Sequence, residues 1–403
     1  MENLTFWRDL TPFPAPLRTP VDSSPRILIV GGGVTGLVTA WTLLGRGYDV
    51  TILAKEWASY GPSQRLTSQI AGALWEFPPA VCGQHTDAIS LQNSKRWCMV
   101  SYHIWDAIAA TAASRKDDQF PIERAGVRMK HADFFFPEPL EANPAETAKM
   151  LETMASGVRG FRRGPAIIEE RRVSSSFGAR RLRDEFGVDI IVNATGLAGT
   201  ELAGDDSCYP IRGGLIRVVN DGRDFTRVDA ALTISADAAH SASEIVFLVP
   251  RNDDVLLIGG IAEPHEPHLD LTLDSPIIRR MRARCEAFLP DLKRARLDAG
   301  YPLAQGLRPF RQCNARVERE LRMRRGGANV DVDADAAGTD TKPSRIVHSY
   351  GQGGAGWSLS FGCAGDGAIL VEEALLDLPL RPVMVETAVS KPLSRPRKPP
   401  EWA

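Results

Sequence analysis

Residues 26–56 read RILIVGGGVTGLVTAWTLLGRGYDVTILAKE, and this stretch decides the fold. The apolar run RILIVG predicts a β-strand, and DVTILA predicts a second strand. Between them we expect a helix from about Val34 to Arg46, because Gly45 and Gly47 are typical of a helix end. Strand, glycine turn, helix and strand in this order open a dinucleotide-binding fold, so the sequence predicts a parallel sheet here.

The expected helix carries apolar side chains at helical spacing. Leu37, Ala40, Trp41 and Leu44 recur every three or four residues. This periodicity predicts that the four side chains form one apolar face that packs against the protein.

The glycines of GGGVTG have separate tasks. Gly31 allows the tight turn, Gly33 lets a pyrophosphate approach the backbone, and Gly36 lets the helix pack closely on the strand. The first helical turn, with Val34 and Thr35, presents free N–H groups toward phosphates. These residues predict a dinucleotide site, but the glycine pattern alone does not separate FAD from NAD.

Composition sets limits on the remaining possibilities. The chain has 403 residues and a net charge of −2, which gives no electrostatic argument for a nucleic-acid or membrane partner. Six cysteines and seven histidines show no metal-like spacing, so no metal is expected and a reducing compartment is the default. No apolar run reaches about 18 residues, so no membrane-spanning helix is predicted.

Further elements follow along the chain. VDIIVNATG (188–196) predicts a strand covered on both faces, and FLVP (247–250) with VLLIGG (255–260) predicts a hairpin. A helix is expected at about 274–288. A strand at 345–351 leads into a glycine-rich segment, and a final helix begins at about Ser358.

Three segments look irregular. Residues 1–25 predict an irregular N-terminal arm, and 326–343, rich in Gly, Asp and Ala, predict an exposed polar insertion. Residues 376–403 predict a disordered tail.

The parallel unit at one end and the hairpin strands in the middle together predict a two-domain α/β enzyme. Its dinucleotide domain draws on both ends of the chain.

Five motifs in a fixed order resemble the D-amino-acid oxidase and D-aspartate oxidase family of FAD enzymes, from Arg26 to about Leu375. They are TSQIAGALWEFPP (67–79), VNATGLAG (192–199), YPIRGGLIRV (209–218), GLRPFR (306–311) and HSYGQGGAGWSLSFGCA (348–364). The resemblance implies an α/β fold in which a Rossmann-like FAD-binding domain is interleaved with an antiparallel-sheet substrate domain. The expected ranges are 26–375 for the whole enzyme, about 26–80, 186–200 and 340–375 for FAD binding, and about 205–325 for the substrate.

The resemblance also implies residues that bind FAD. Glu56, 20 residues after Gly36, would accept hydrogen bonds from ribose hydroxyls beside Lys55. Thr195 and Gly196 would approach the cofactor from the other side. Other positions would follow the pyrophosphate or the flavin ring: Thr67, Ser68, Ala73, Leu74, Gly353, Gly354, Gly356, Trp357 and Ser358. Tight loop packing is the alternative explanation for these small residues.

Arg308 is the residue expected to bind the substrate. It lies in an apolar strand bounded by proline, where an unpaired guanidinium is costly and a bidentate carboxylate offsets the cost. The resemblance implies that this carboxylate is the α-carboxylate of an amino acid. A structural salt bridge with Glu318 or Glu320 is the alternative.

The implied reaction is oxidation of a D-amino acid. A hydride leaves the α-carbon for the flavin, dioxygen yields hydrogen peroxide, and the imino acid hydrolyses to a 2-oxo acid and ammonia. Arg308, Phe247 and Gly354 are the residues assigned to the substrate side of this reaction. No acid–base residue is required, so we expect His348 to pack near the cofactor rather than act as a base.

The sequence departs from the family at the pocket. Family members carry tyrosines where this chain has SASEIVFLVP, with Ser243 and Phe247. Weaker carboxylate binding or a different substrate is expected, although Tyr350 and Trp357 could contribute to the pocket. A preference for acidic substrates would need a second cation, for which Arg212 and Arg311 are the candidates.

A second departure precedes Val188. Family members have an additional helix and strand on the adenine side of the FAD domain, and this block is missing between FRRGPAIIEERRVSSSFGARR and VDIIVNATG. Its loss is expected to open the sheet beside the cofactor.

Two other functions stay open. One is an amine oxidase of the same family that acts on an intermediate of specialised metabolism. The other is a degenerate member that has lost FAD. The expected partners are dioxygen and a small molecule with amino and carboxylate groups, and a homodimer is left open. A cytoplasmic location is the default. The family's usual compartment is the peroxisome, but no C-terminal Ser-Lys-Leu signal supports it here.

Overall fold

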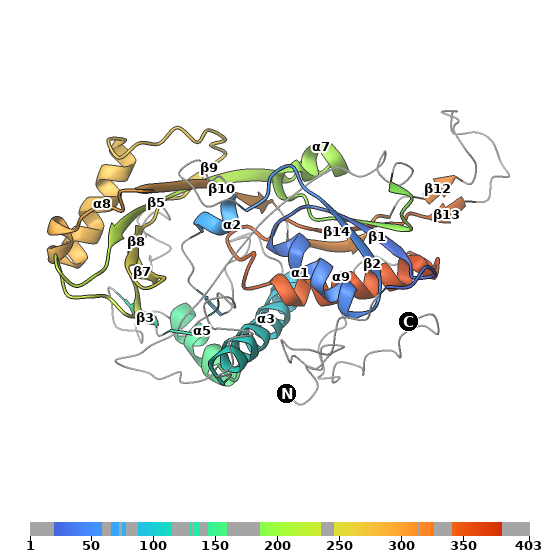
Figure 1. Cartoon of the computed structure of the whole chain (residues 1–403), viewed down its shortest axis with the longest axis horizontal. Coiled ribbons are helices and arrows are strands. Elements are labelled where there is room, and N and C mark those ends of the chain that lie inside the picture. The colour runs from blue at the N-terminus through green and yellow to red at the C-terminus, as the bar shows by residue number, and fades with distance from the viewer. Residues whose placement is uncertain are drawn as a thin grey trace.

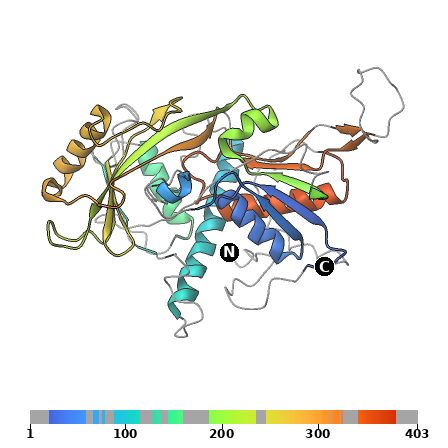
Figure 2. The ribbon, with the colours of Figure 1, turned by 45° about the horizontal axis from the view of Figure 1, so that its top comes forward.

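Two β-sheets lie end to end and form the two halves of the molecule (Figures 1 and 2). A computed structural model provides this view, and helix α2 (Thr67–Ile70) lies between the halves. The structure describes residues 20–58, 66–71, 75–77, 88–114, 127, 129–130, 132–136, 144–158, 186–234, 246–312, 314–321, 323–325 and 341–380.

The first sheet has the strand order β11-β14-β4-β1-β2 and takes its strands from distant parts of the chain. They are β1 (Arg26–Val30), β2 (Asp49–Leu53), β4 (Ile190–Asn193), β11 (Arg316–Arg319) and β14 (Ile346–Tyr350). β1 pairs in parallel with β2 and β4, and β4 pairs in parallel with β14. The carboxyl ends of these four strands therefore meet at one edge of the sheet.

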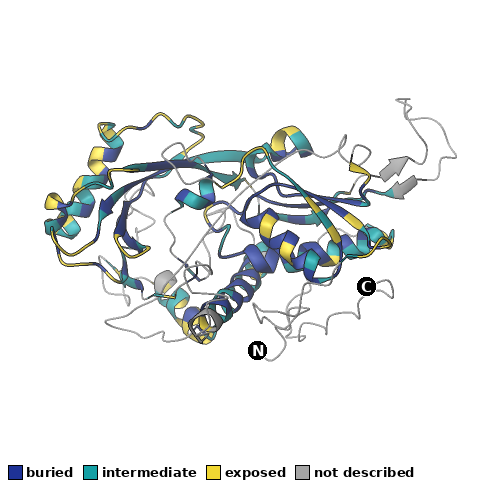
Figure 3. Ribbon diagram, in the orientation of Figure 1, coloured by how far each residue is buried: buried dark blue, intermediate teal, exposed yellow. Residues whose placement is uncertain are grey.

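The central strands of this sheet are buried on both faces. Every residue of β4 is buried, as the uninterrupted apolar run predicts (Figure 3). Helices α1 (Val34–Gly45) and α9 (Ser360–Leu375) cover one face of the sheet. The long helix α3 (Ala88–Ser114) packs against α9.

The expected bounds of α1 are confirmed, but the expected apolar face is wrong for two of its residues. Leu37 and Trp41 are each 37% exposed, whereas Ala40 and Leu43 belong to the core. The helix approaches the sheet closely, so small side chains such as Gly36 and Ala40 occupy the contact. The bulky residues lie outside it.

The second sheet has the order β10-β5-β8-β7-β6-β3, with β9 also paired to β5. Its strands are β3 (Ala132–Phe135), β5 (Cys208–Val219), β6 (Ala231–Ile234), β7 (Val246–Arg251), β8 (Val255–Gly259), β9 (Glu263–Pro264) and β10 (Leu303–Arg311). β7 and β8 form the expected hairpin. All pairings are antiparallel except the parallel pair β3–β6, which the sequence did not indicate.

Helix α8 (Pro276–Phe288) confirms the helix expected at 274–288, and it packs through Ile278, Met281 and Cys285 on the second sheet. The remaining described elements are α5 (Pro144–Ala155), η3 (Gly196–Ala198), α7 (Gly199–Ala203) and η4 (Pro290–Arg294). β12 (Met323–Arg325) and β13 (Thr341–Pro343) pair antiparallel as a separate two-stranded sheet.

Several expectations fall partly or wholly outside the described residues. The predicted insertion at 326–343 ends in strand β13, and its first part, 326–340, is not described. Most of the expected arm (1–25) and of the expected tail (376–403) also lies outside the described residues. Residues 159–185, next to the position of the inferred missing helix and strand, are not described either. The described helices include none that is both long enough and apolar enough to cross a membrane.

Candidate active site

The glycine turn has the geometry that its sequence predicts. Gly31 follows β1 with φ +137°, a conformation that favours glycine, and its N–H donates to the Leu53 carbonyl at 2.8 Å. A Cβ atom at Gly36 would lie 1.8 Å from the Gly31 carbonyl oxygen. Gly36 therefore allows α1 to pack against the turn, and the N-terminus of α1 is directed toward the carboxyl edge of the sheet.

A pocket of about 790 Å³ of empty space, open solvent included, lies where this edge meets the second sheet. The first sheet contributes the start of α1 and the loops that follow β4 and β14. The second sheet contributes Gly213, Gly214 and Leu215 of β5 and the middle of β10. The pocket thus lies at the carboxyl ends of parallel strands, where ligands bind in open α/β sheets.

Ten of the residues predicted for the site line this pocket: Val34, Thr35, Thr67, Ser68, Gly196, Arg308, Gly353, Gly354, Gly356 and Trp357. They come from five separate segments, and contacts between segments hold them together. The Thr67 hydroxyl donates to the Leu307 carbonyl at 2.8 Å, and the Gly353 N–H donates to the Pro309 carbonyl at 2.9 Å. Gly353 has φ +56°, so glycine suits this loop.

The other predicted residues lie around the pocket or away from it. Gly31, Gly33 and Gly36 form the turn that precedes the lining residues of α1. Thr195 and Ser358 are buried beside the lining residues Gly196 and Trp357. Three further groups complete the set: Lys55 and Glu56 are exposed just after β2, Phe247 is half-buried in β7, and Ala73 and Leu74 lie outside the described residues.

Arg308 is the only ionisable residue among the described residues that line the pocket. Its guanidinium lies against Gly213, where a Cβ atom would come within 2.6 Å of Nη2. Nη1 donates to the Ile261 carbonyl at 3.2 Å. Burial lowers the pKa of Arg308 to about 10, because the charged form loses its hydration.

The structure contradicts a salt bridge between Arg308 and Glu318 or Glu320. Glu318 accepts from Arg316 Nε at 2.7 Å, and Glu320 accepts from the Ser344 hydroxyl at 2.6 Å. Within the described part of the chain, no carboxylate forms an ion pair with Arg308. Its carboxylate-binding capacity is directed into the pocket.

The two candidates for a second cation are engaged elsewhere. Arg212 Nε donates to Glu263 at 2.7 Å, and Arg212 Nη1 donates to Asp270 at 2.5 Å. Arg311 Nε donates to Asp205 at 2.8 Å. Neither arginine lines the pocket, so neither supports a preference for acidic substrates.

The aromatic residues considered from the sequence separate into two groups. Trp357 lines the pocket, and Phe247 packs on an apolar cluster that includes the lining residues Ile70 and Leu215. Tyr350 is 1% exposed, and its hydroxyl donates to Asp205 at 2.8 Å. Tyr350 therefore stabilises the structure behind the pocket.

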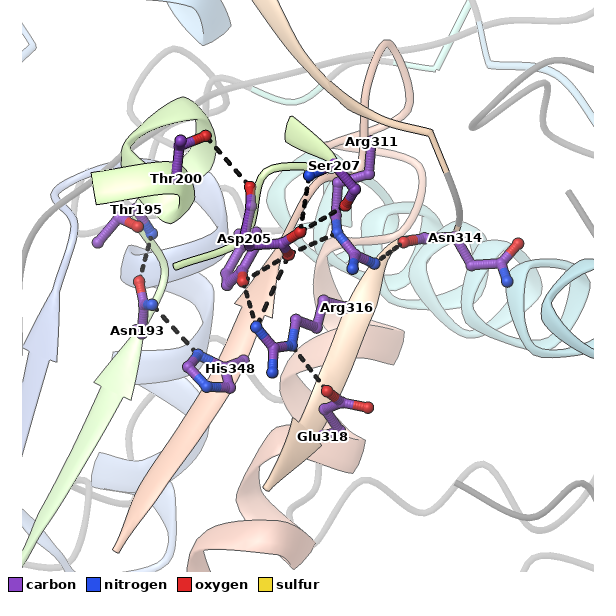
Figure 4. Close-up of polar contacts among 11 residues, drawn as sticks. Asn193, Thr195, Thr200, Asp205, Ser207, Arg311, Asn314, Arg316, Glu318 and His348 are labelled. Atoms are coloured by element: carbon purple, nitrogen blue, oxygen red, sulfur yellow. Dashed lines mark hydrogen bonds and ion pairs between the residues drawn. The ribbon is translucent and has the colours of Figure 1, made fainter. Parts of the chain in front are cut away.

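Figure 4 shows how the loops at the carboxyl edge are joined. Asn193, the last residue of β4, has its amide nitrogen 3.2 Å from His348 Nδ1. Its amide oxygen accepts from the Thr195 N–H at 3.2 Å. His348 is buried in β14 and does not line the pocket, so its contact with Asn193 holds the Thr195 loop in place.

Sequence reasoning did not assign several lining residues. Gly213, Gly214 and Gly306 lie inside strands β5 and β10. At Gly306 a Cβ atom would lie 2.3 Å from Ile70 Cδ1, so the glycine makes room for α2. Glycine within a strand often marks the close approach of a ligand or another segment, and that signal is present in YPIRGGLIRV and GLRPFR.

Comparisons with known proteins show what the chain as a whole is similar to. A family model described as FAD dependent oxidoreductase matches residues 26–368. A D-amino-acid oxidase of Rubrobacter xylanophilus is 29% identical over 373 residues, which cover 87% of this chain and 97% of that protein. A D-amino-acid oxidase of Streptomyces coelicolor is 29% identical over 362 residues, with 85% and 96% covered. The crystal structure of glycine oxidase from Bacillus cereus superposes with a TM-score of 0.56 at 16% identity. It covers 90% of this chain and 100% of that one, and so shows a shared fold.

Proposed function

Since the chain belongs to the FAD dependent oxidoreductase family, we propose that it oxidises a D-amino acid at the α-carbon and passes the electrons to dioxygen. The products are hydrogen peroxide and an imino acid, which hydrolyses to a 2-oxo acid and ammonia. Two relatives named D-amino-acid oxidase support the substrate class.

The observation that carries the proposal is Arg308. A half-buried guanidinium without a carboxylate partner among the described residues lines the pocket beside the glycine loop. A substrate carboxylate would supply two charge-assisted hydrogen bonds to it. The apolar lining residues Ile70, Leu215 and Ala304 give such a substrate room for a neutral side chain.

The residues present fit FAD. Gly31 and Gly36 form the phosphate-binding turn, and the N-terminus of α1 would hold the pyrophosphate. Two buried polar atoms, Thr195 Oγ1 and Trp357 Nε1, have no hydrogen-bond partner among the described residues. They lie in loops at the carboxyl edge, where the polar atoms of a cofactor could satisfy them.

The residues of the chain supply binding and orientation. Arg308 binds the carboxylate and, with the glycine loop at 353–356, fixes which face of the α-carbon is presented. Trp357 and the apolar residues exclude water from the reacting carbon. No lining residue that the structure describes offers a carboxylate or an imidazole, so we expect proton removal from the amine to be left to solvent. FAD, when bound, accepts the hydride and reduces dioxygen.

Anaerobic absorption spectroscopy tests the proposal. The purified protein, loaded with FAD, is mixed with neutral D-amino acids and separately with their L-enantiomers. We expect the flavin bands to bleach with the D-enantiomers alone, and peroxide to form when oxygen is admitted. Bleaching by the L-enantiomers, or by none of the amino acids, would contradict the proposal.

A second candidate is an amine oxidase whose substrate has no carboxylate. It is favoured by the absence of a tyrosine from the described pocket lining, because Phe247 offers no hydroxyl to assist Arg308. Primary and secondary amines that bleach the flavin where D-amino acids do not would establish this alternative.

A further inference from the structure

Asp205 lies behind the pocket, between α7 and β5, and its side chain is 7% exposed. Its carboxylate accepts hydrogen bonds from Arg311 Nε at 2.8 Å and from the Tyr350 hydroxyl at 2.8 Å (Figure 4). It also accepts from the Ser207 N–H at 3.2 Å, and Arg316 Nη1 lies 3.7 Å away. Asp205 does not line the pocket.

The partners of Asp205 lead to the two sides of the pocket. Arg311 ends β10, three residues after Arg308, and a Cβ atom at Gly351 would lie 2.4 Å from Arg311 Cδ. Tyr350 ends β14 and precedes Gly351, which has φ +81°. The carboxylate thus joins the strand of Arg308 to the start of the glycine loop.

Other contacts make this junction rigid. A Cβ atom at Gly199 would lie 2.7 Å from Tyr350 Cε2, so α7 packs directly on the Tyr350 ring. The Tyr350 hydroxyl also accepts from Arg316 Nη1 at 2.6 Å. Three segments, the ends of β10 and β14 and the start of β11, therefore meet at one carboxylate.

We propose that Asp205 is a positioning residue: through Arg311 and Tyr350 it sets the separation between Arg308 and the glycine loop at 353–356. The inference rests on the proposed function only in the role of Arg308 as the carboxylate anchor. A shift of either segment changes where a bound carboxylate lies relative to the flavin site, and misplacement by about 1 Å can cost up to about 100-fold in rate.

The test uses Asp205→Asn in the full-length, FAD-loaded protein, with Asp206→Asn as the matched control. Asp206 is the neighbouring carboxylate and is exposed. The probe is butanoate, a carboxylate with no amino group, titrated while the visible flavin spectrum is recorded. We expect Asp205→Asn to raise the butanoate dissociation constant and the KM for a D-amino acid about 10-fold, and to lower kcat by up to about 100-fold because the bound substrate is misplaced. Asp206→Asn is expected to change neither.

A double-mutant cycle shows whether Asp205 acts through Arg308. In an Arg308→Lys background, Asp205→Asn is expected to change the butanoate dissociation constant less than about 2-fold, since the positioned group is already altered. A full 10-fold effect in that background would overturn the inference. An unchanged dissociation constant combined with a lower melting temperature would also overturn it, because that result indicates a purely structural role.

Tyr350→Phe decides the question if Asp205→Asn fails to fold. It removes one hydrogen bond to the carboxylate and keeps the buried ring, and we expect an increase of about 3-fold in the butanoate dissociation constant. An unchanged butanoate dissociation constant in Tyr350→Phe would contradict the inference.

The butanoate titration also separates this inference from the proposed function, because it needs no turnover. A parent protein that binds butanoate but oxidises no D-amino acid would refute the proposed function alone.

Discussion

At the scale of single residues, the arginines differ in how their charge is compensated. Arg212 and Arg311 form ion pairs with carboxylates at 2.7 and 2.8 Å. Among the described residues Arg308 has only one hydrogen bond, to a backbone carbonyl, although burial lowers its pKa to about 10. A cation kept in this setting costs stability, so its retention is best explained by a ligand.

Arg308→Met tests that explanation. Loss of a charge-assisted, bidentate contact of about 1.5–3 kcal/mol predicts a fall of about 10- to 100-fold or more in kcat/KM for D-amino acids. The melting temperature should not fall, because the substitution removes a half-buried charge that has no carboxylate partner among the described residues. Steady-state kinetics and thermal unfolding measure the two effects.

The control for Arg308→Met is Arg294→Met in η4, which removes an arginine from an exposed ion pair with Asp291. It should alter neither activity nor melting temperature appreciably. A large drop in the melting temperature of Arg308→Met would instead show that Arg308 is mainly structural.

Gly213→Ala tests the space beside the guanidinium. The added Cβ atom would lie 2.6–2.9 Å from the guanidinium atoms of Arg308, so the side chain must move. We expect KM for the D-amino acid to rise about 10-fold or more. Gly300→Ala, whose Cβ atom would lie 3.7 Å from Asp298 Oδ1, is the matched control and should behave as the parent. Equal KM values for the two variants would contradict the geometry.

At the scale of elements, helix α1 shows what periodicity can and cannot predict. Its bounds follow from the glycines at both ends, and these are visible in the sequence. Its buried face does not follow from hydrophobicity, because close packing on the sheet selects Gly36 and Ala40 over Leu37 and Trp41. The space between α1 and the sheet determines which face of the helix is buried, and a single sequence does not reveal how large that space is.

Two glycine-to-alanine substitutions in helices should have opposite effects. At Gly36 the new Cβ atom meets the Gly31 carbonyl oxygen at 1.8 Å, so the turn must open. We expect Gly36→Ala to lose flavin on purification and to unfold at a lower temperature. At Gly365 of α9 an added Cβ atom would meet no described atom within 4 Å outside the nearby backbone of its own helix, so Gly365→Ala should stabilise the protein by about 0.5–1 kcal/mol.

The ratio of visible flavin absorbance to protein absorbance measures cofactor content, and urea unfolding measures stability. A Gly36→Ala protein that keeps its full flavin content would refute the close-packing argument for the glycine turn. A destabilised Gly365→Ala protein would show that the space beside α9 is filled.

At the scale of the whole molecule, the pocket exists because two sheets meet. The sequence predicted the parallel unit, the β7–β8 hairpin and most of the segments that line the pocket. It did not predict that β11, within the range expected for the substrate domain, joins the first sheet. It also did not assign Gly213 and Gly306, whose importance depends on side chains distant in sequence. Local patterns predict elements, whereas contacts between segments define the site.

The junction at Asp205 should make stability depend on pH. Burial alone would raise the pKa of this carboxyl, but hydrogen bonds from Ser207, Tyr350 and Arg311 outweigh burial and lower the pKa from 3.8 to about 2. A lowered folded-state pKa stabilises the protein above the unfolded value, and this stabilisation is lost as the pH falls from about 4 to about 2.

Comparison with Asp205→Asn isolates this effect. The parent should exceed the variant in free energy of unfolding by an amount that is constant above about pH 4 and that shrinks by about 2 kcal/mol toward pH 2. Urea unfolding at a series of pH values provides the measurement. A difference that is independent of pH across this interval would contradict the role assigned to the charge.

The order of strands in the first sheet has a consequence for how the protein is made. β4 is flanked by β1, which is translated early, and by β14, which is translated after residue 345. The nascent polypeptide must keep β1 and β2 without their complete sheet until residue 350 has been translated. Cofactor capture therefore waits for a strand made about 300 residues after the glycine turn.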